Sequence, residues 1–481
     1  MRASNFGSIL SVGAYVPRLR LARTTIANAI AWANPQARSA ASGSRAVGNW
    51  DEDALTMAAE AARAALVGVE TPIGAVTLAA TSLPFADRDN AVLLASALDL
   101  AENIESLNAG ASLRAGTSAL AAAARRSDGV RTLVAAADLR LTRPGSAQEL
   151  TFGDAAAAMV VGPATGNALA QVLAAHHVGA DFVDHYRMSG ESFDYALEER
   201  WVREAGYAKL VPEAVSAALA SAGVAGVAVN HLLLPAPAAI AKRIAKLAGL
   251  SQAQLQDNLH AEVGDCGTAL PLLMLAAALE TAQPEQTIVV IGFGQGVDTL
   301  VLRTGAGVAK RTPRVAAALN RRVDEPSYTR YLAHRGILQL DFGMRAERDQ
   351  RTAQTVAWRK HRDLTAFVGG RCSSCGTVQF PRSRVCVNPQ CRVADTQLPH
   401  RLADGRGHVK SYTEDWQAYS PRPPYLYGNV EFGEGGNLLM EFTDAEPGEI
   451  TAGDTVRFVF RIKDQDRVRA FRRYFWKAVK V

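Results

Sequence analysis

The chain has 481 residues, of which 48% are hydrophobic, so it is long enough for roughly three domains with sizeable buried cores. Its net charge of +5 is mild, no apolar run reaches the ~18 residues of a membrane-spanning helix, and the N-terminus lacks the long apolar segment of a signal peptide. We therefore expect a cytoplasmic protein without membrane contacts, in which cysteines serve as metal ligands rather than disulfides.

The first 165 residues alternate short apolar strands with Ala-rich helices. Acidic residues at the start of 50–66 favour a helix there, with these acids in its first turn near the positive end of the helix dipole. A second helix is predicted at 112–126. The strands are predicted at 7–17, 75–85 (with a loop), 130–141 and 154–162.

Residues 166–305 repeat this alternation. The expected strands are 169–181, 227–237 and 287–294, and the expected helices are 207–224, 238–250 and a buried one at 268–280. Two such series in succession predict an α/β fold with two similar halves, 1–165 and 166–305.

The pattern then changes three times. Residues 306–365 are predicted to form a polar connector that ends in a charged bridging helix. A cysteine-rich segment follows at 366–404, and 405–481 contains several short strands whose spacing suits a small all-β barrel.

Four of the five cysteines lie within twenty residues: Cys372, Cys375, Cys386 and Cys391. Two close pairs on two loops can place four thiolates at the corners of a tetrahedron, which is the arrangement that Zn²⁺ prefers in closed structural sites. Gly376 and Pro389 suit the tight turns of such knuckles. We therefore predict a structural zinc ion without an open coordination position.

Positive charge gathers in two places. Residues 351–410 carry eleven Lys/Arg and three Asp/Glu, and a second cluster closes the chain at Arg467, Arg469, Arg472, Arg473, Lys477 and Lys480. Such surfaces meet the phosphates of coenzyme A, meet nucleic acid or are simply solvated. Nucleic-acid binding is not expected, because no RNA-type aromatic and basic motif accompanies them.

Several motifs in the first 305 residues occur in an informative order: NWDEDALTMAAEAARAAL, Leu113-Arg114-Ala115-Gly116-Thr117, GDAAAAMVVG, D-H-Y-R at 184–187, the loop at Gly264 and GFGQGVD. With them, residues 1–305 resemble the 3-hydroxy-3-methylglutaryl-CoA synthase branch of the thiolase superfamily. This resemblance implies a two-half, layered thiolase-like fold that forms homodimers.

Residues 326–481 contain WRKHRDLTAFVGGRCSSCGTVQFPRSRVC, GHVKSYT and ITAGDTVRFVF. They resemble the zinc-ribbon and OB-fold accessory proteins that accompany acyl-CoA thiolases and synthases. The resemblance implies acyl-CoA binding and a separate catalytic thiolase subunit as partner. The exposed face of the ribbon offers four arginines for the CoA phosphates: Arg371, Arg382, Arg384 and Arg392.

The chemistry of the superfamily uses a Cys nucleophile at a helix N-terminus, a His, an Asn and, in the synthase branch, a Glu. Local alignment places these residues on Leu113, Pro235, Asp265 and Thr81, in that order. All four positions are therefore substituted, and no catalytic residue is assigned. The plain expectation is that this body does not run the family reaction by the family mechanism.

Two fallback nucleophiles remain in the sequence. Cys266 follows the Asn position, and Ser112 adjoins the Cys position. His231, on the strand before the Pro235 loop, is more often a satisfied core or edge histidine, and Asp154 is more often a turn residue.

Two classes of function follow. The favoured one is an auxiliary, non-catalytic subunit that binds acyl-CoA and a catalytic thiolase. The alternative is an active synthase-like acyltransferase that uses Cys266 or Ser112. A covalent acyl adduct on this chain would discriminate between them.

Overall fold

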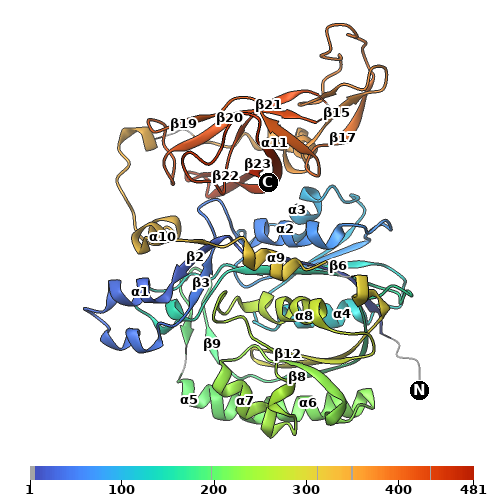
Figure 1. Ribbon diagram of the computed structural model, residues 1–481, viewed down its shortest axis with the longest axis vertical. Helices are drawn as coiled ribbons and strands as arrows, with labels where there is room; N and C mark the ends of the chain where they lie inside the picture. Colours follow the sequence, from blue (N-terminus) through green and yellow to red (C-terminus); the bar gives the residue numbers. More distant parts are fainter. Residues whose placement is uncertain (1–5, 197, 311, 348–349, 434) are drawn as a thin grey trace. The chain divides into compact units, whose positions relative to one another are not determined.

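The computed structural model describes residues 6–196, 198–310, 312–347, 350–433 and 435–481 (Figure 1). The chain divides into two units. Unit 1 comprises Met1–Gly48, Asp53–Leu94 and Ala101–Tyr331, and unit 2 comprises Asn49–Glu52, Ala95–Leu100 and Leu332–Val481. No helix in the described ranges is long and apolar enough to cross a membrane. The five domains expected from the sequence, with their boundaries, stay predictions.

Unit 1 begins with a first series of strands and helices. Its strands are β1 (Ser8–Tyr15), β4 (Ala75–Ala79), β5 (Glu105–Ala109), β6 (Thr132–Asp138) and β7 (Ala155–Gly162), and its helices are α2 (Ala54–Leu66), α3 (Asn90–Ala97) and α4 (Ala115–Ala124). Every residue of β6 and β7 is buried. Their continuous apolar sequences, without alternation, are typical of strands covered on both faces.

A second series follows the same plan. Its strands are β8 (Ala170–Gly179), β11 (Val229–Leu233), β12 (Thr287–Phe293) and β13 (Gly296–Thr304), and its helices are α6 (Ala208–Ala222), α7 (Ala238–Leu247) and α8 (Leu270–Thr281). The predicted buried helix at 268–280 is thus confirmed as α8. Strand β13 was not predicted as a separate strand.

The two series are arranged alike around their shared centre. The nine strands lie in the order β11-β12-β13-β8-β1-β7-β6-β4-β5, joined at the antiparallel contact of β1 with β8. In the first series β7 pairs antiparallel with β1 and with β6, and β6 pairs parallel with β4. In the second series β13 likewise pairs antiparallel with β8 and with β12, and β12 pairs parallel with β11. An isolated parallel bridge between Leu232 and Leu255 stands in the second series where β5 stands in the first.

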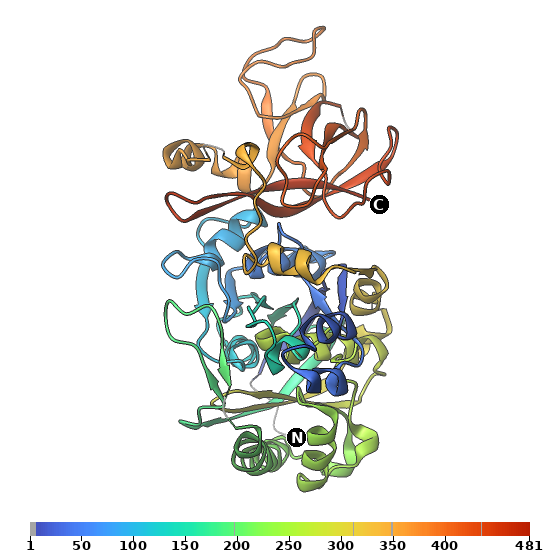
Figure 2. The ribbon, with the colours of Figure 1, turned by 90° about the vertical axis from the view of Figure 1, so that its left-hand side faces the viewer.

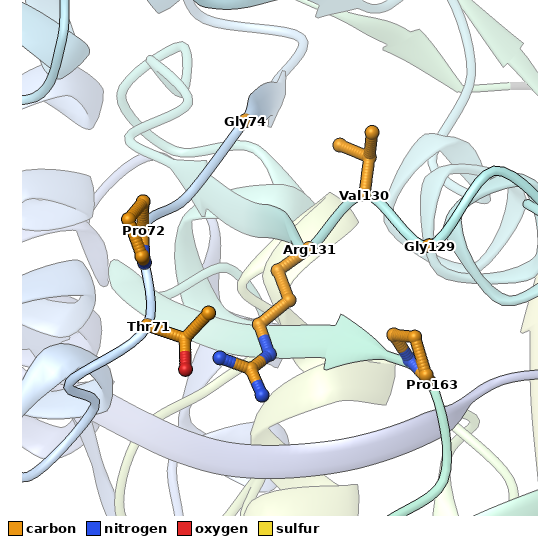
Figure 3. A pocket seen from close by; sticks show the side chains of 7 residues that line it. All are labelled: Thr71, Pro72, Gly74, Gly129, Val130, Arg131 and Pro163. Carbon is orange, nitrogen blue, oxygen red and sulfur yellow. The ribbon is translucent and has the colours of Figure 1, made fainter.

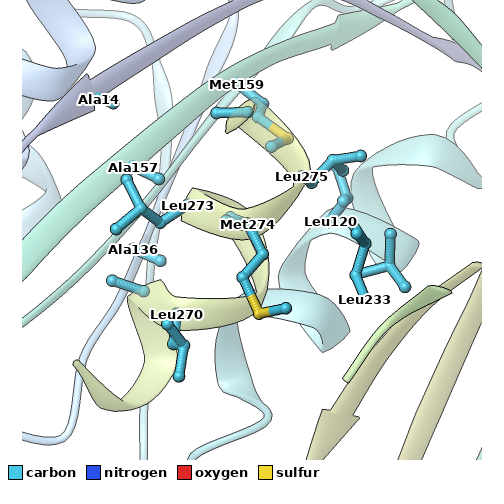
Figure 4. Close-up of a cluster of buried hydrophobic side chains, with 14 of the residues drawn as sticks. Ala14, Leu120, Ala136, Ala157, Met159, Leu233, Leu270, Leu273, Met274 and Leu275 are labelled. Atoms are coloured by element: carbon cyan, nitrogen blue, oxygen red, sulfur yellow. The ribbon is translucent and has the colours of Figure 1, made fainter. Parts of the chain in front are cut away.

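The elements of unit 1 form five layers (Figure 1). Helix α2 covers β1 and β7 on one side, helices α4 and α8 lie between the two strand series, and α6 covers β8 and β13 on the other side. Figure 4 shows the middle layer, where Leu273 and Met274 of α8 pack among Leu120, Ala157 and other buried side chains of both series. The small side chains of α4 allow this close approach.

The remaining elements of unit 1 are short. A three-stranded sheet combines β2 (Leu19–Ala22), β3 (Ser44–Val47) and β14 (Val323–Asp324), and a hairpin combines β9 (His185–Tyr186) with β10 (Tyr195–Ala196). The short helices are α1 (Arg23–Ile30), α5 (Glu199–Trp201) and α9 (Arg314–Asn320), and the boundary between the units falls within α10 (Tyr328–His334).

Helix α2 begins later than the sequence predicted. It starts at Ala54, and no acidic residue lies in its first turn. Asp53 is the N-cap instead: its side chain accepts a hydrogen bond from the Thr56 amide at 2.9 Å, and the Thr56 hydroxyl accepts one from the Asp53 amide. Asp51 precedes the cap, and its carboxylate accepts a hydrogen bond from Lys477. The acids therefore lie before the helix, and the prediction that they lie in its first turn was wrong.

Unit 2 consists of short helices and antiparallel strands. Helices α11 (Gln354–Arg359) and α12 (His361–Thr365) precede a sheet of β15 (Val368–Cys372), β16 (Val378–Gln379) and β17 (Gln397–Arg401). The second sheet contains β18 (Arg406–Val409), β19 (Thr413–Asp415), β20 (Tyr425–Phe432), β21 (Asn437–Glu441), β22 (Thr455–Asp466) and β23 (Phe471–Lys480). Its ladders form an open path, and one isolated bridge joins Phe442 to Ala478.

Phe367 lies at the centre of the aromatic core of unit 2. Its ring is fully buried and contacts the rings of Phe380, Phe432, Phe458, Phe475 and Trp476 at centroid distances of 5.1–6.1 Å. These rings come from β20, β22, β23 and the loop after β16, so the residues around the two sheets share one core.

Strand β23 was not predicted, because its cationic side chains were read as a solvated or ligand-binding cluster. Lys477 is 1% exposed and donates to Asp51 at 3.0 Å, and it pairs with Glu441 at 3.1 Å. Arg461 of β22 is fully buried between Glu52 and Asp444. Lys477 is therefore not a surface cation, and the prediction is corrected at this residue.

Candidate functional sites

The four predicted zinc ligands meet at one point of unit 2. The Sγ atoms of Cys372, Cys375, Cys386 and Cys391 all lie within 4.8 Å of one another. The Sγ–Sγ distances are 3.8 Å between Cys372 and Cys391 and 3.6 Å between Cys375 and Cys386. A tetrahedral site with Zn–S bonds of about 2.3 Å requires sulfurs about 3.8 Å apart, whereas a disulfide requires about 2.05 Å. The thiols therefore fit zinc.

The local turns explain how the chain brings these thiols together. Cys372 ends β15, and its carbonyl accepts a hydrogen bond from the Gly376 amide at 2.8 Å. Gly376 has φ +77°, the left-handed region that favours glycine. The Cys391 amide closes the second knuckle on the Asn388 carbonyl at 3.0 Å. With four thiolates from the protein, the ion has no open position and acts as a structural element.

The four residues predicted to occupy substituted family positions lie at equivalent places in the two strand series, and their assignment to the family's positions stays a prediction. Thr81 follows β4, and Pro235 follows β11, its counterpart. Leu113 precedes the central helix α4, and Asp265 precedes the central helix α8. All four positions therefore belong to the carboxyl ends of parallel strands or the start of a central helix, where open α/β sheets bind ligands.

Thr81 is held by a buried carboxylate that the sequence did not single out. Asp138, the last residue of β6, accepts hydrogen bonds from the Thr81 amide at 2.8 Å and hydroxyl at 3.0 Å. Its other oxygen accepts from the Thr268 amide at 2.8 Å and hydroxyl at 2.9 Å. Asp138 is fully buried and thereby connects the loop after β4 to the start of α8.

Asp265 is paired with a buried arginine. Its Oδ1 lies 3.1 Å from Nη2 of Arg140, a side chain that is 4% exposed and that stacks over the Phe152 ring at 3.6 Å. Burial by itself would raise the pKa of Asp265, but the Arg140 guanidinium, the neighbouring His260 and the hydrogen bond from the Gly267 amide together lower the pKa below its ordinary value. Asp265 is therefore a carboxylate with a fixed cationic partner.

The backbone next to Asp265 requires glycine. Gly264 has φ +98°, and a Cβ there would lie 2.8 Å from the Phe152 carbonyl oxygen. Phe152 and Asp265 form a parallel bridge, so the loop before α8 lies directly against the segment before β7. This close contact explains the glycine in the Gly264 motif.

The β9–β10 hairpin is bonded to the same network. Arg187 donates from Nη2 to the Thr81 carbonyl at 2.6 Å, and its Nε lies 3.2 Å from Asp194 Oδ1. The other oxygen of Asp194 lies 3.8 Å from Arg140. Arg187, Asp194 and Arg140 thus form a chain of charges from the hairpin to Asp265, and the structure brings Thr81 and Asp265 into one network.

Leu113 lies beside the Gly-rich turn after β12, where a Cβ on Gly294 would be 3.0 Å from the Leu113 amide nitrogen. The hydroxyl of Ser112 donates to the Gly294 carbonyl at 2.6 Å, and Arg114 Nε donates to the same oxygen at 3.2 Å. Arg114 also pairs with the buried Asp298 at 2.8 Å. The start of α4 is therefore fixed to the strand ends of the second series.

The other candidate residues have structural partners. Cys266 is fully buried, and burial, reinforced by the Asp265 charge, raises the pKa of its thiol well above the ordinary value. His231 Nε2 lies 2.8 Å from Gln286 Oε1 on the edge of β11. Asp154 accepts a hydrogen bond from the Gly48 amide at 2.8 Å. Pro235 has no amide hydrogen to donate.

A pocket of ≈ 370 Å³ lies away from these positions (Figure 3). Gly74, before β4, and Arg131, before β6, line it, together with Thr71, Pro72, Gly129, Val130 and Pro163. It therefore opens at the amino ends of the strands whose carboxyl ends carry Thr81 and Asp138.

The predicted CoA-phosphate arginines are all exposed on or beside the ribbon. Arg384 is already engaged, because its guanidinium lies 2.8 and 3.0 Å from the two carboxylate oxygens of Asp395. Binding of phosphate by Arg371, Arg382, Arg384 and Arg392 stays a prediction.

Three charged residues of the candidate site were not predicted from the sequence. Asp138, Arg140 and Asp194 had no motif of their own. The available signal was a charged pair, Asp138 and Arg140, at the end of an otherwise apolar strand, where side chains of α/β sheets meet ligands or one another.

Two family models match the C-terminal part of the chain. Residues 361–397 match the rubredoxin-like zinc ribbon domain of ChsH2, and residues 400–461 match the C-terminal OB-fold domain of ChsH2. A DUF35 domain-containing scaffold protein of Methanocaldococcus jannaschii is 30% identical over 113 residues, which cover 23% of this chain and 78% of that protein.

The thiolase-like body of the chain matches hydroxymethylglutaryl-CoA synthases. A hydroxymethylglutaryl-CoA synthase of Archaeoglobus fulgidus is 27% identical over 343 residues, 68% of this chain and 98% of that enzyme. The solved structure of MvaS in complex with 3-hydroxy-3-methylglutaryl coenzyme A superimposes with a TM-score of 0.59 and 18% identity over 70% of this chain and 92% of that one. The predicted thiolase-like fold is thereby confirmed. The chain belongs, through its C-terminal part, to the DUF35 domain-containing family, and it joins the ChsH2-type zinc ribbon and OB fold of that part to a hydroxymethylglutaryl-CoA synthase-like body of thiolase fold.

Proposed function

We propose that this chain is an auxiliary, non-catalytic subunit of an acyl-CoA thiolase or synthase system. It binds acyl-CoA and a separate catalytic thiolase, which supplies the chemistry. One observation carries this proposal: the two residues that local alignment assigns to the family's acid/base and amide positions have structural partners, since Thr81 is bonded to Asp138 and Asp265 is paired with Arg140.

Electrostatics support the proposal. Acyl transfer from a thioester develops an oxyanion, which needs hydrogen-bond donors directed at it. The carboxylate of Asp265 repels such a charge, and its low pKa keeps it ionised near neutral pH. Pro235 supplies neither an amide hydrogen nor a side-chain donor. These residues oppose the family reaction in this body.

Neither fallback nucleophile is poised to react. The attacking form of cysteine is the thiolate, and the buried thiol of Cys266 has a raised pKa that disfavours it. The hydroxyl of Ser112 donates its proton to the Gly294 carbonyl rather than to a basic side chain. The relocated-nucleophile alternative therefore has less support than the auxiliary role.

The relatives support the choice of partner. The Methanocaldococcus relative is named a scaffold protein, and MvaS was solved with a coenzyme A thioester. A chain that fuses both parts suits a subunit that holds acyl-CoA beside a thiolase.

A free sheet edge supports the further proposal of a homodimer through the body. Strand β5 lies at the end of the nine-stranded order, and Leu107 in its middle is 58% exposed. Exposed edge strands offer unpaired backbone groups to a second chain.

The test is turnover of acetoacetyl-CoA condensation and thiolysis by the purified chain, alone and with candidate thiolases. The proposal expects no turnover alone, and activity with a partner that survives Cys266→Ala. Robust turnover alone that Cys266→Ala or Ser112→Ala abolishes would establish the acyltransferase alternative.

A further inference from the structure

One surface of unit 2 combines an exposed indole with several cations. Trp358, in the last turn of α11, is 73% exposed. The His361 ring stacks on it, with 5.1 Å between centroids and 15° between planes, and His361 Nδ1 lies 2.8 Å from the Trp358 carbonyl oxygen. The imidazole is thus held against the indole, and the pair presents an aromatic surface to solvent.

Single exposed aromatic side chains are common on protein surfaces, so a binding site at Trp358 requires suitable residues around it. The turn of the β22–β23 hairpin lies at the start of α11 (Figure 2). The Thr352 amide donates to Asp466 Oδ2 at 2.8 Å, and Arg469 Nη1 donates to the Thr352 carbonyl at 3.2 Å. Helix α11 begins two residues later, and Trp358 lies about 6 Å along its axis from the first residue.

The two segments that meet there are basic. Residues 350–363 and 464–473 together contain eight Lys/Arg and three Asp/Glu. The acids already have partners: Asp466 is 1% exposed and accepts from Thr352, and Asp363 lies 3.4 Å from Lys360. Arg359, the last residue of α11, and Arg467, in the turn of the β22–β23 hairpin, are both exposed. The surface therefore offers net positive charge beside the aromatic pair.

We propose that Trp358, His361, Arg359, Lys360 and Arg467 bind the adenosine 3′-phosphate 5′-diphosphate end of a coenzyme A thioester. The adenine stacks on the indole, and the phosphates meet the cations. One exposed indole suits one base, whereas surfaces for single-stranded nucleic acid present several aromatic rings to successive bases. This inference rests on the proposed acyl-CoA binding and gives that ligand a site beyond the ribbon arginines.

The experiment titrates the zinc-loaded, full-length chain with coenzyme A and with adenosine 3′,5′-bisphosphate, and measures heat and tryptophan fluorescence. Base–aromatic stacking is worth about 1–3 kcal/mol, so Trp358→Ala should weaken binding of both probes at least fivefold. Trp358→Phe keeps a ring and should lose less, and Arg467→Glu should weaken binding most at low salt. Trp416→Ala is the matched control, because Trp416 is 65% exposed on the loop after β19 beside Asp415.

The outcomes separate this inference from the proposed function. Coenzyme A binding by the wild type that is equal in Trp358→Ala would overturn the site and leave the proposed function intact. Absence of binding by the wild type would overturn both. A single-stranded RNA that binds at Trp358 more tightly than coenzyme A would also contradict the assignment.

Discussion

Arg140 and Asp265 form an ion pair, 3.1 Å from Nη2 to Oδ1, and Asp265 lies in the loop before the central helix α8. Arg140 is the side chain that connects the site: it also faces Asp194 at 3.8 Å and covers the Phe152 ring. Asp265, which the local sequence alignment predicts to occupy the family's Asn position, is thus part of a structural charge network.

Replacement of Arg140 by methionine should destabilise the chain by about 3–5 kcal/mol, because the carboxylates of Asp265 and Asp194 would lose their buried cation. The matched control is Arg126→Met. Arg126 also pairs with two acids, Glu105 and Asp128, but these are 65% and 49% exposed, so its loss should cost about 0–1 kcal/mol. Denaturant unfolding measures both, and equal effects would show that the Arg140 network contributes nothing special.

The β9–β10 hairpin should open when its charge contact is removed. Arg187→Ala deletes the hydrogen bond to the Thr81 carbonyl and the pair with Asp194. Hydrogen exchange of residues 185–196 should become about tenfold faster or more, since such charged bonds contribute about 1.5–3 kcal/mol. Arg200→Ala, on the exposed helix α5, is the control and should leave this exchange unchanged. Unaltered exchange in Arg187→Ala would show that the contacts of Arg187 do not hold the hairpin in place.

Zinc should be bound at one ion per chain by the four cysteines. Elemental analysis of protein purified without added metal should give this ratio, and X-ray absorption should give four Zn–S distances of about 2.3 Å. A Cys372→Ser/Cys386→Ser double variant should lose the ion, while Cys266→Ser should retain it. Zinc retained by the double variant would refute this ligand set.

The stability of unit 2 should depend on Glu441 in acid. Burial alone would raise the pKa of Glu441, but Lys477 and Lys463 lower it from 4.5 to about 2. Because the folded pKa lies below the unfolded one, the stabilisation is complete above pH 4.5 and disappears as the pH falls toward 2. It corresponds to about 3 kcal/mol at neutral pH.

Denaturant unfolding between pH 7 and pH 3 checks this expectation. Glu441→Gln should be the less stable protein at pH 7, and the gap to the wild type should narrow steadily below pH 4.5. A stability difference between Glu441→Gln and the wild type that stays constant with pH would show that the charge of the Glu441 carboxylate is not the source of the stabilisation.

The sequence allowed the zinc site and the order of the strand series to be predicted, because both depend on local patterns. The cysteine pairs lie within twenty residues, and apolar runs such as 154–162 are readable as buried strands without knowledge of their neighbours. The start of α2 was misjudged although its capping box, formed by Asp53 and Thr56, is itself a local pattern. The role of Lys477 was misjudged for the opposite reason. Lys477 meets Asp51, 426 positions away, and no local pattern shows that partner.

The same limit applies to the candidate site. Local alignment predicted four substituted positions, but the side chains that bind these residues were not visible in the sequence. Arg140 reaches Asp265 across 125 positions, and Asp138 links Thr81 to Thr268 across two loops. Only the fold brings these residues together, since each is a common surface residue type by itself.

The most direct test of the auxiliary role is a search for a covalent acyl-enzyme. The zinc-loaded chain is incubated with radiolabelled acetyl-CoA, quenched in acid and analysed by peptide mass spectrometry, with a catalytically complete thiolase as positive control. We expect label on the thiolase and none on this chain. An acetyl group on Cys266 or Ser112, formed at a rate that supports turnover, would contradict it.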